Sequence, residues 1–443
     1  MRRYVILGSG AAGVAAAETI REMDPSGALW MVTADPHGYY SRPGLAYYLT
    51  GEATREQLYP FPNRYWKEIG LRWHVEAVVG IDPPGHRLIM KSGKDLPYDR
   101  LLVATGAKAT IPDTPGMDLQ GVVKLDTMED ADRIVKMARR GRSAVVVGGG
   151  ITALELVEGL AARGMRVHYF LRGERFWPGV LDETESRLVE HLLEHDGVTL
   201  HFHTNLVEVL GRAGQVIGVR AREGEEDIQL ECTMVAVAIG IRPRKELAEK
   251  AGLQVGRGVR VNQCLQTSHP DVFAAGDVAE ALDPRSGEYV LDSLWNPAID
   301  MGFAAGRGMA GRLTPYVKEV PFNVTRLAGL VTTIVGQIAA KPDALLIDHD
   351  LPGIMRGDSE VWRQHPEAVV AQRLLNGTRL RLYLHEGRMV GGVVMGDQAL
   401  SRPVHRLVLS GADISPIVPY LLAPGARLDQ LIMEFSPQYA IPA

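Results

Sequence analysis

The chain has 443 residues, of which 46% are hydrophobic and 48 are glycine, and its formal net charge is −5. This length predicts about three domains of a glycine-rich α/β protein, and the lack of a basic excess argues against nucleic-acid or membrane-surface binding. The two cysteines, Cys232 and Cys264, exclude a disulfide framework and a cysteine metal site. No apolar run has the length and context of a signal peptide or membrane span, so we expect a cytoplasmic protein.

A glycine-rich turn opens the chain. Residues 4–13, YVILGSGAAG, form an apolar run of strand character that ends in Gly8, Gly10 and Gly13, and a small-residue helix pattern follows. The first glycine permits a tight turn, the second lets a phosphate approach the backbone, and the third lets helix and strand pack closely. Amide groups at the helix start then face the anion. Asp35, after the next apolar segment, is placed to accept a hydrogen bond from a ribose 2′-hydroxyl.

The segments after this turn predict the rest of a first nucleotide-binding domain. Arg42 lies in a tyrosine-rich loop and is a candidate phosphate partner, although it could instead stack on the neighbouring rings. Residues 71–100 alternate in polarity and contain turn signals, which predict short antiparallel strands. LLVATGA, residues 101–107, predicts a buried parallel strand that ends in small residues, and residues 111–118 read as a linker.

A second strand, glycine turn and helix is predicted at residues 143–160. Gly148, Gly150 and Ala153 occupy the three positions of the dinucleotide fingerprint, and alanine is an accepted third residue. A charged helix, residues 128–140, precedes this unit. Two such units in one chain imply two dinucleotides, for which a flavin and a nicotinamide nucleotide are the natural pair.

The second unit lacks a carboxylate at the ribose position. Leu171 stands there, followed by Arg172 and Arg175. Without the acid, the 2′-hydroxyl loses its acceptor and a 2′-phosphate loses a source of repulsion, while arginine supplies a charge-assisted donor. NADPH is therefore favoured over NADH. The alternative is that both arginines are solvated surface charges and either nucleotide is used.

One histidine pattern imitates a zinc motif. His191 and His195 fit H-x-x-E-H, and His201 and His203 follow. Because the segment runs from a charged helix into a strand, as a nucleotide-binding unit requires, we expect exposed helix and strand positions and no metal site.

The segments from residue 230 onward predict a return to the first domain and then a change of pattern. A buried strand ends near Gly276, and Asp277 is placed either to bind a flavin ribityl chain or to cap a helix formed by VAEAL, residues 278–282. Trp295 and Ala298 begin a small-residue helix, and the tryptophan either edges a flavin ring or is a core residue. After about residue 320, strands joined by the turns NGT and EGR and a closing helix pair predict an α+β domain.

Five motifs now occur in one order: GSGAAG with its acid, LLVATGA, VVVGGGITALE, AIGIRPR and TSHPDVFAAGD. Together they resemble FAD-dependent pyridine nucleotide reductases of the glutathione-reductase fold over essentially the whole chain. YYSRPGLAYYL and LYLHEGRMVGGVVMGD are most similar to rubredoxin and ferredoxin reductases and to the flavin portion of NAD(P)H-dependent nitrite reductases. The resemblance implies an α/β protein with two Rossmann-like domains, an FAD domain at residues 1–112 and 242–320 and an NAD(P) domain at 113–241, plus a C-terminal α+β interface domain at 321–443.

The resemblance also implies roles for matching residues. The FAD site would include Gly8, Gly10, Ala12, Gly13, Asp35, Arg42, Pro43, Val78, Ala104, Thr105, Gly106, Gly276, Asp277, Trp295 and Ala298. The NAD(P)H site would include Gly148, Gly150, Ile151, Glu155, Arg172, Arg175 and Gly240. Glu155, Tyr47 and Trp295 are the candidate catalytic residues, although Glu155 could be an ordinary helix residue.

Two departures from the family pattern narrow the chemistry. Disulfide-reducing and water-forming oxidase relatives carry a cysteine in the loop after the ribose acid, where this chain has Pro43, so thiol chemistry is disfavoured. Ferredoxin-reductase relatives often place a lysine beside flavin N5, and the nearest match here is Tyr47. With no C-terminal cysteine cluster, an iron–sulfur or sirohaem centre must belong to a partner.

The sequence therefore predicts an enzyme that passes hydride from NAD(P)H to FAD and electrons onward to a partner redox protein such as a rubredoxin, a ferredoxin or a nitrite reductase-type subunit. Three alternatives remain: an NAD(P)H oxidase that reduces oxygen, a disulfide or persulfide reductase, and a non-catalytic flavin-binding subunit of a larger complex. A homodimer through the last domain is a further expectation from the resemblance.

Overall fold

The computed structural model describes residues 1–283, 287–318, 320–338, 353–354, 369–375, 378–423 and 427–438. The chain forms two compact units. The first comprises Met1–Pro112, Val123–Met137 and Ile239–Lys318, and the second comprises Asp113–Val122, Ala138–Ala238 and Glu319–Ala443.

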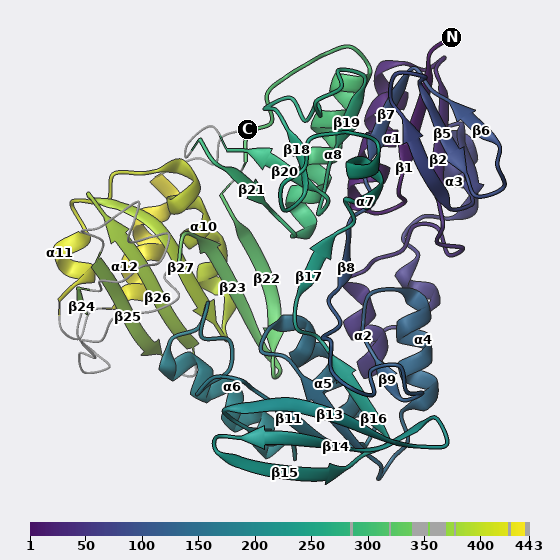
Figure 1. Cartoon of the computed structure of the whole chain (residues 1–443). Coiled ribbons are helices and arrows are strands. Elements are labelled where there is room, and N and C mark those ends of the chain that lie inside the picture. The colour runs from purple at the N-terminus through teal and green to yellow at the C-terminus, as the bar shows by residue number, and fades with distance from the viewer. Residues whose placement is uncertain are drawn as a thin grey trace. The chain divides into compact units, whose positions relative to one another are not determined.

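A parallel five-stranded sheet is the centre of the first unit (Figure 1). Its order is β19 (Val272–Ala274), β7 (Arg100–Val103), β1 (Arg3–Leu7), β2 (Ala28–Thr33) and β3 (Leu71–Val75). All four pairings are parallel, so the prediction that residues 71–75 start an antiparallel hairpin is wrong. The antiparallel strands come next, as β4 (Val78–Asp82), β5 (Arg87–Met90) and β6 (Asp95–Pro97). Since β3 extends the buried parallel sheet, its alternation reflects an edge position rather than a hairpin.

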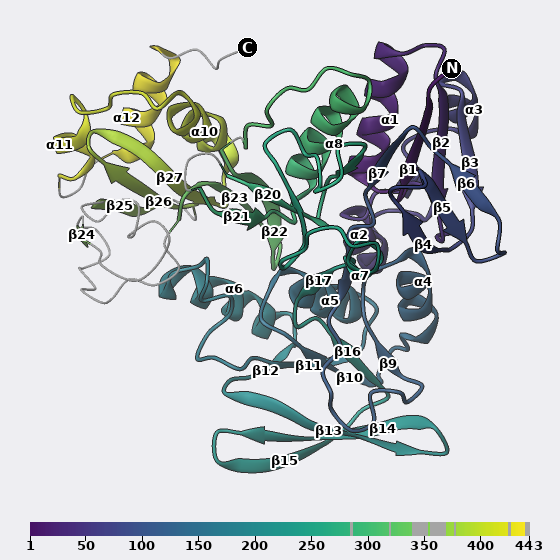
Figure 2. The ribbon, with the colours of Figure 1, turned by 45° about the horizontal axis from the view of Figure 1, so that its top comes forward.

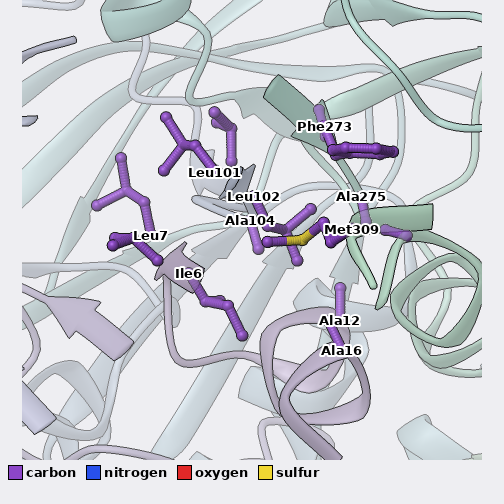
Figure 3. Close-up of a cluster of buried hydrophobic side chains, with 14 of the residues drawn as sticks. Ile6, Leu7, Ala12, Ala16, Leu101, Leu102, Ala104, Phe273, Ala275 and Met309 are labelled. Atoms are coloured by element: carbon purple, nitrogen blue, oxygen red, sulfur yellow. The ribbon is translucent and has the colours of Figure 1, made fainter. Parts of the chain in front are cut away.

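Two small-residue helices pack beside this sheet. Helix α1 (Ala11–Met23) lies along α8 (Trp295–Met309), and a Cβ atom on Gly302 of α8 would lie 2.4 Å from the backbone oxygen of Ala12. The two helices can pack this closely because Gly302 has no side chain at the contact. Figure 3 shows how Ala12 and Ala16 face the sheet residues Ile6, Leu102 and Phe273 in one buried cluster.

The remaining elements of the first unit surround this core. They are α2 (Gly44–Thr50), α3 (Asn63–Glu68), α4 (Met128–Met137), α7 (Glu246–Lys250), the pair β8 (Ala107–Ala109) and β17 (Ile241–Pro243), and the sheet β18 (Val259–Val261), β20 (Ala279–Leu282) and β21 (Tyr289–Leu291). The segment VAEAL is strand β20, paired with β18 and β21. Asp277 therefore caps no helix there, and the capping alternative is wrong because tertiary pairing overrides the local helix pattern.

The second unit contains another sheet, whose first four strands in the order below pair in parallel. Its order is β12 (Thr199–His201), β11 (Arg166–Phe170), β10 (Ser143–Val147), β16 (Met234–Val237) and β9 (Val122–Val123). Helices α5 (Ile151–Ala162) and α6 (Glu183–His195) connect its strands, as predicted. An antiparallel meander of β13 (Thr204–Arg212), β14 (Gln215–Glu223) and β15 (Glu226–Glu231) forms its own layer in Figure 2.

The second unit also contains an antiparallel sheet. Its order is β22 (Phe322–Leu327), β23 (Leu330–Gly336), β27 (Arg388–Met395), β26 (Thr378–His385), β25 (Val369–Leu375) and β24 (Gly353–Ile354). Helices α10 (Ser401–Ser410), α11 (Val418–Leu421) and α12 (Leu428–Phe435) bury its core, and α10 and α12 lie on one face (Figure 2). The predicted EGR turn joins β26 to β27, whereas Asn376 and Gly377 of the NGT turn lie outside the described residues.

Two Rossmann-like sheets and a C-terminal α+β region confirm the predicted fold class. Within the described ranges, no helix has both the length and the apolar character needed to cross a bilayer.

Candidate dinucleotide-binding sites

The first glycine turn joins β1 to α1 in the way the fingerprint requires. Gly8 has φ 120°, and a Cβ atom on it would lie 2.1 Å from the backbone oxygen of Ala104. A Cβ atom on Gly13 would lie 2.2 Å from the Gly8 oxygen, so neither position accepts a side chain. Gly10, the N-cap of α1, has nothing within 4 Å of such an atom and provides no side-chain cap.

This arrangement fits a pyrophosphate. The first turn of α1 contains no acidic residue, so its uncapped amide groups and the helix dipole present positive potential to the open space at Gly10. The site therefore has the donor set and the space that a dinucleotide phosphate needs.

Three predicted residues from distant parts of the chain meet at this turn. Gly276, with φ 76°, would place a Cβ atom 3.1 Å from the Cβ of Ala12 and 3.7 Å from that of Ala298. The loop after β19 and the starts of α1 and α8 are thus brought together. Asp277 follows directly, and burial raises the pKa of its carboxyl while the nearby positive charge of Arg42 opposes the rise.

The ribose acid is held in place by its own loop. Asp35 accepts hydrogen bonds from the His37 backbone amide at 2.8 Å and from the Tyr40 hydroxyl at 3.2 Å. The Tyr40 hydroxyl also accepts from the Met128 amide at 3.1 Å. Asp35 is partly exposed, which leaves carboxylate surface available to a ribose.

Arg42 is bound to a residue that the sequence did not single out. Its guanidinium donates to the Asp126 backbone oxygen at 2.7 Å and to Oδ1 of the same residue at 3.3 Å. Arg244 and Lys124 pair with the other carboxylate oxygen at 2.9 and 3.6 Å. Because Asp126 is 84 residues from Arg42 and belongs to no nucleotide motif, no local signal could have revealed it.

The linking strands carry further predicted residues. The Thr105 hydroxyl donates to the Arg244 backbone oxygen at 3.1 Å, and the Thr110 amide donates to the Gly240 oxygen at 2.9 Å. Gly106 and Gly240 both have positive φ and open space where a side chain would be. Val78 begins β4. Gly240 thus belongs to the first unit, whereas the other residues predicted for NAD(P)H belong to the second.

Candidate residues for the flavin ring lie on two helices of the first unit. Pro43 is the exposed N-cap of α2, and Tyr47 on the same helix is 44% exposed. Trp295, the first residue of α8, is partly buried, with its ring centroid 6.3 Å from that of Tyr39. Tyr39 also contacts Phe61 and Trp66, an aromatic cluster that the sequence analysis did not identify.

The second glycine turn repeats the geometry of the first. Gly148 has φ 147°, and a Cβ atom on it would lie 2.2 Å from the backbone oxygen of Ala238. Gly150 is the uncapped N-cap of α5 with nothing within 4 Å, and Ile151 is the first helical residue. Ala153, the accepted third residue of the fingerprint, is fully buried. A second uncapped helix start therefore faces open space.

Glu155 lies on α5 one turn after Ile151. Burial, reinforced by the charge of Glu158, raises the pKa of the Glu155 carboxyl to about 7. A carboxyl with a strongly raised pKa is a candidate functional group, so this shift is compatible with a role for Glu155 beyond that of an ordinary helix residue.

The loop from β11 to α6 carries the two predicted arginines. Leu171 is 1% exposed, Arg172 is exposed, and the Arg175 side chain is 12% exposed. Arg175 pairs with Glu174 at 3.2 Å, and its Nε is buried without a hydrogen-bond partner among the described residues.

The histidines of the zinc-like pattern lie only partly where they were expected. His191 and His195 are exposed on α6, and His201 ends β12. His201 Nε2 lies 3.1 Å from His168 Nδ1 on the neighbouring strand. The prediction of exposed helix and strand positions is therefore correct for His191 and His195. The His201 side chain is only 12% exposed, and His203 lies in the turn before β13 with φ 50°.

Two uncapped glycine turns, each at the start of a helix beside a parallel sheet, define a protein that binds two dinucleotides. The family model described as pyridine nucleotide-disulphide oxidoreductase matches residues 2–302, so the chain belongs to that family. It is an FAD-dependent oxidoreductase that uses NAD(P)H.

Individual relatives differ in what they reduce. The chain is 32% identical over 338 residues to the NADH oxidase of Methanocaldococcus jannaschii, with 74% of each chain covered. It is 30% identical over 396 residues to the rubredoxin-NAD(+) reductase of Ectopseudomonas oleovorans, covering 89% of this chain and 99% of that one. The solved covalent putidaredoxin reductase–putidaredoxin complex matches with a TM-score of 0.81 at 23% identity over 98% of both chains, which supports the fold.

Proposed function

We propose that the enzyme transfers electrons from NAD(P)H through FAD to a separate redox protein that carries an iron–sulfur or sirohaem centre. The observation that carries the proposal is Pro43 at the N-cap of α2, where thiol-dependent relatives are expected to have a cysteine. A proline offers no nucleophilic sulfur, so electrons must leave the flavin without a thiol relay.

The two cysteines do not compensate. Cys232 is buried, and burial raises the pKa of its thiol to about 12, so it carries no thiolate near neutral pH. Cys264 lies in the loop between β18 and β19, outside the glycine turns. Because neither cysteine is placed to relay electrons from the flavin, the proposal assigns the next redox centre to the acceptor protein.

The chain's own residues would bind and orient the two dinucleotides. We assign FAD to the turn at Gly8, Gly10 and Gly13, with Asp35 on its ribose and Asp277 on its ribityl chain. NAD(P)H would bind the turn at Gly148 and Gly150, with Glu155 beside the nicotinamide. When bound, FAD supplies a carrier that accepts a hydride and releases electrons, while the protein contributes alignment and exclusion of water.

The proposal also includes a division into three domains and a homodimer. We propose an FAD domain at residues 1–112 and 242–320, an NAD(P) domain at 113–241 and an interface domain at 321–443. A homodimer through the interface domain is proposed with it, and size-exclusion chromatography with light scattering measures that state.

The deciding experiment is anaerobic stopped-flow spectroscopy of the purified holoprotein. NADPH or NADH should bleach the flavin, and the reduced protein should then reoxidise faster with rubredoxin or ferredoxin than with oxygen or coenzyme A persulfide. If neither nucleotide bleaches the flavin, the proposal that the protein oxidises NAD(P)H is wrong, and a non-catalytic flavin-binding subunit is favoured.

Oxygen reduction is the second candidate, because the NADH oxidase relative is 32% identical to this chain. Its product would be peroxide, since the loop thiol expected of water-forming relatives is replaced by Pro43. Turnover with oxygen that exceeds turnover with every added redox protein, accompanied by stoichiometric peroxide, would support this candidate against the first.

A further inference from the structure

Two buried arginines of β26 reach the N-terminus of α6 within the second unit. Arg379 and Arg381 are each 1% exposed, and as alternate residues of one strand they point to the same face. Arg379 Nη2 lies 2.8 Å from Asp182 Oδ2. Arg381 binds both carboxylate oxygens of Glu185, through Nε at 2.9 Å and Nη2 at 2.8 Å.

The two carboxylates that these arginines bind also cap helix α6. Asp182 and Glu185 form the capping box of α6: the Glu185 amide donates to the Asp182 side chain at 2.8 Å, and the Asp182 amide donates to the Glu185 side chain at 3.0 Å. Each carboxylate therefore serves the helix cap and a buried arginine at once. This double use fixes the position of the helix start more tightly than a cap alone.

Arg381 also holds the loop that precedes the helix. Its Nη2 donates to the Val180 backbone oxygen at 2.8 Å. Four residues earlier in the loop, the Phe176 amide donates to Glu190 Oε1 at 2.7 Å, and the Phe176 backbone oxygen accepts from the Ser186 hydroxyl at 2.7 Å. The loop is thus tied to α6 at Phe176 and to β26 at Val180.

Arg175 is the residue immediately before the first of these anchors. Its side chain is mostly buried, yet among the described residues its Nε has no hydrogen-bond partner. Arg175 Nη1 pairs with the adjacent Glu174 at 3.2 Å. A buried guanidinium donor without an acceptor is costly unless a ligand supplies one. Arg175 is joined directly to Phe176, whose backbone is hydrogen-bonded to α6.

We propose that Arg381 is a positioning residue for nucleotide recognition: by fixing the loop between Leu171 and Asp182, it orients Arg175 toward the 2′-phosphate of NADPH. The inference rests on the proposed function, because it assumes that the nucleotide binds at the Gly148 turn. The last sheet of the chain thereby takes part in choosing between NADPH and NADH.

A purely stabilising role would not require charges here. Replacing a buried ion pair by apolar residues of similar volume is often neutral or stabilising, so the network's distinctive contribution is a fixed geometry. Bidentate arginine contacts set direction as well as distance, and lysine, as a point charge, cannot bind Glu185 and the Val180 oxygen with the same fork.

The test compares the native holoprotein with Arg381→Lys by titration calorimetry, using 2′,5′-ADP and 5′-ADP as probes. We expect 2′,5′-ADP binding to weaken about tenfold and 5′-ADP binding less than about twofold. In steady-state kinetics the KM for NADPH should rise while that for NADH and both kcat values change little. Arg175→Met should lower the preference for 2′,5′-ADP, and adding Arg381→Lys to it should cause no further loss.

Matched variants separate positioning from stability. Arg220→Lys changes an exposed arginine of the same unit, paired with Glu208 at 2.7 Å, and should leave both affinities unchanged. If Arg381→Lys does not fold, Glu185→Gln provides the second variant, because it keeps the side-chain shape and weakens the arginine contact. In either variant, a lower melting temperature with an unchanged ratio of the two affinities would overturn the proposal.

The outcomes also separate this inference from the proposed function. Native protein whose flavin is bleached by NAD(P)H, but which binds 2′,5′-ADP no tighter than 5′-ADP, would overturn the inference alone. Native protein whose flavin neither nucleotide reduces would overturn the proposed function as well.

Discussion

Gly8 lies so close to Ala104 that a Cβ atom on the glycine would be 2.1 Å from the Ala104 backbone oxygen. The two residues directly follow the adjacent parallel strands β1 and β7. Gly148 and Ala238 directly follow β10 and β16 and have the equivalent relation, at 2.2 Å. In both sheets, the glycine after the strand has no Cβ atom, so the chain can pass close to the backbone that follows the neighbouring strand before the helix starts. Each turn thus leaves its helix amides open to a phosphate.

Substitutions at two glycines of the first turn should separate folding from FAD binding. Gly8→Ala meets backbone and has an unfavourable φ, so we expect a loss of at least ~2 kcal/mol of stability and of most bound flavin. Gly10→Ala meets nothing within 4 Å in the protein, so apoprotein stability should change little while FAD affinity falls. Thermal unfolding of apoprotein and visible absorbance of bound flavin measure the two effects. Equal effects of both substitutions on unfolding would contradict this assignment.

Arg42→Ala should weaken FAD binding more than it weakens the fold. The side chain is 46% exposed, and pairs of this kind contribute less than about 1 kcal/mol to stability. Loss of a charge-assisted phosphate contact should raise the Kd for FAD about tenfold. Fluorescence titration of apoprotein with FAD gives the Kd. Arg87→Ala, which removes exposed pairs with Asp82 and Asp95, is the matched control and should leave the Kd unchanged.

Glu155 should make stability depend on pH. Its pKa of about 7 in the folded protein lies above the ordinary carboxyl value of 4.5, so folding favours the neutral form. The associated stability is fully present below about pH 4.5 and is lost as the pH rises through about 7, to a total of ~3 kcal/mol. Glu155→Gln should therefore unfold at a higher temperature than the native protein at pH 8 and at a similar one at pH 4.5.

The neighbouring charge provides the control for Glu155. Glu158→Gln removes the repulsion that contributes to the raised pKa, so the pH at which stability is lost should move down. Melting temperatures measured from pH 4.5 to 8 for both variants test this. A Glu155→Gln difference that is constant over that range would show that the carboxyl does not titrate there.

Arg379→Met should destabilise the second unit strongly. Removing this buried cation leaves the negative charge of Asp182 without its nearest positive partner. Breaking a buried ion pair in this way lowers the free energy of unfolding by about 3–5 kcal/mol. Arg220→Met, which breaks an exposed pair with Glu208, should cost less than about 1 kcal/mol. Urea unfolding midpoints compare the two variants, and similar midpoints would show that the buried network adds little stability.

Local sequence patterns predicted the parts of the site that depend on neighbouring residues. Glycine spacing at Gly8 and Gly148 revealed both turns, because strand, turn and helix follow one another within a short stretch of chain. Local patterns were less reliable where pairing decides the outcome. Residues 71–75 joined a parallel sheet and VAEAL became strand β20, because long-range strand partners outweighed local periodicity.

The sequence by itself determined the fold class, the family and the two dinucleotides, since each rests on contiguous motifs with a direct steric meaning. Only the tertiary structure decided which side chains hold those motifs in place: Asp126 binds Arg42 from 84 residues away, and Glu185 binds Arg381 from 196 residues away. Such pairs follow no sequence period. They form because folding brings charges from distant parts of the chain together, and a buried carboxylate such as that of Glu185 is too costly to keep without a partner.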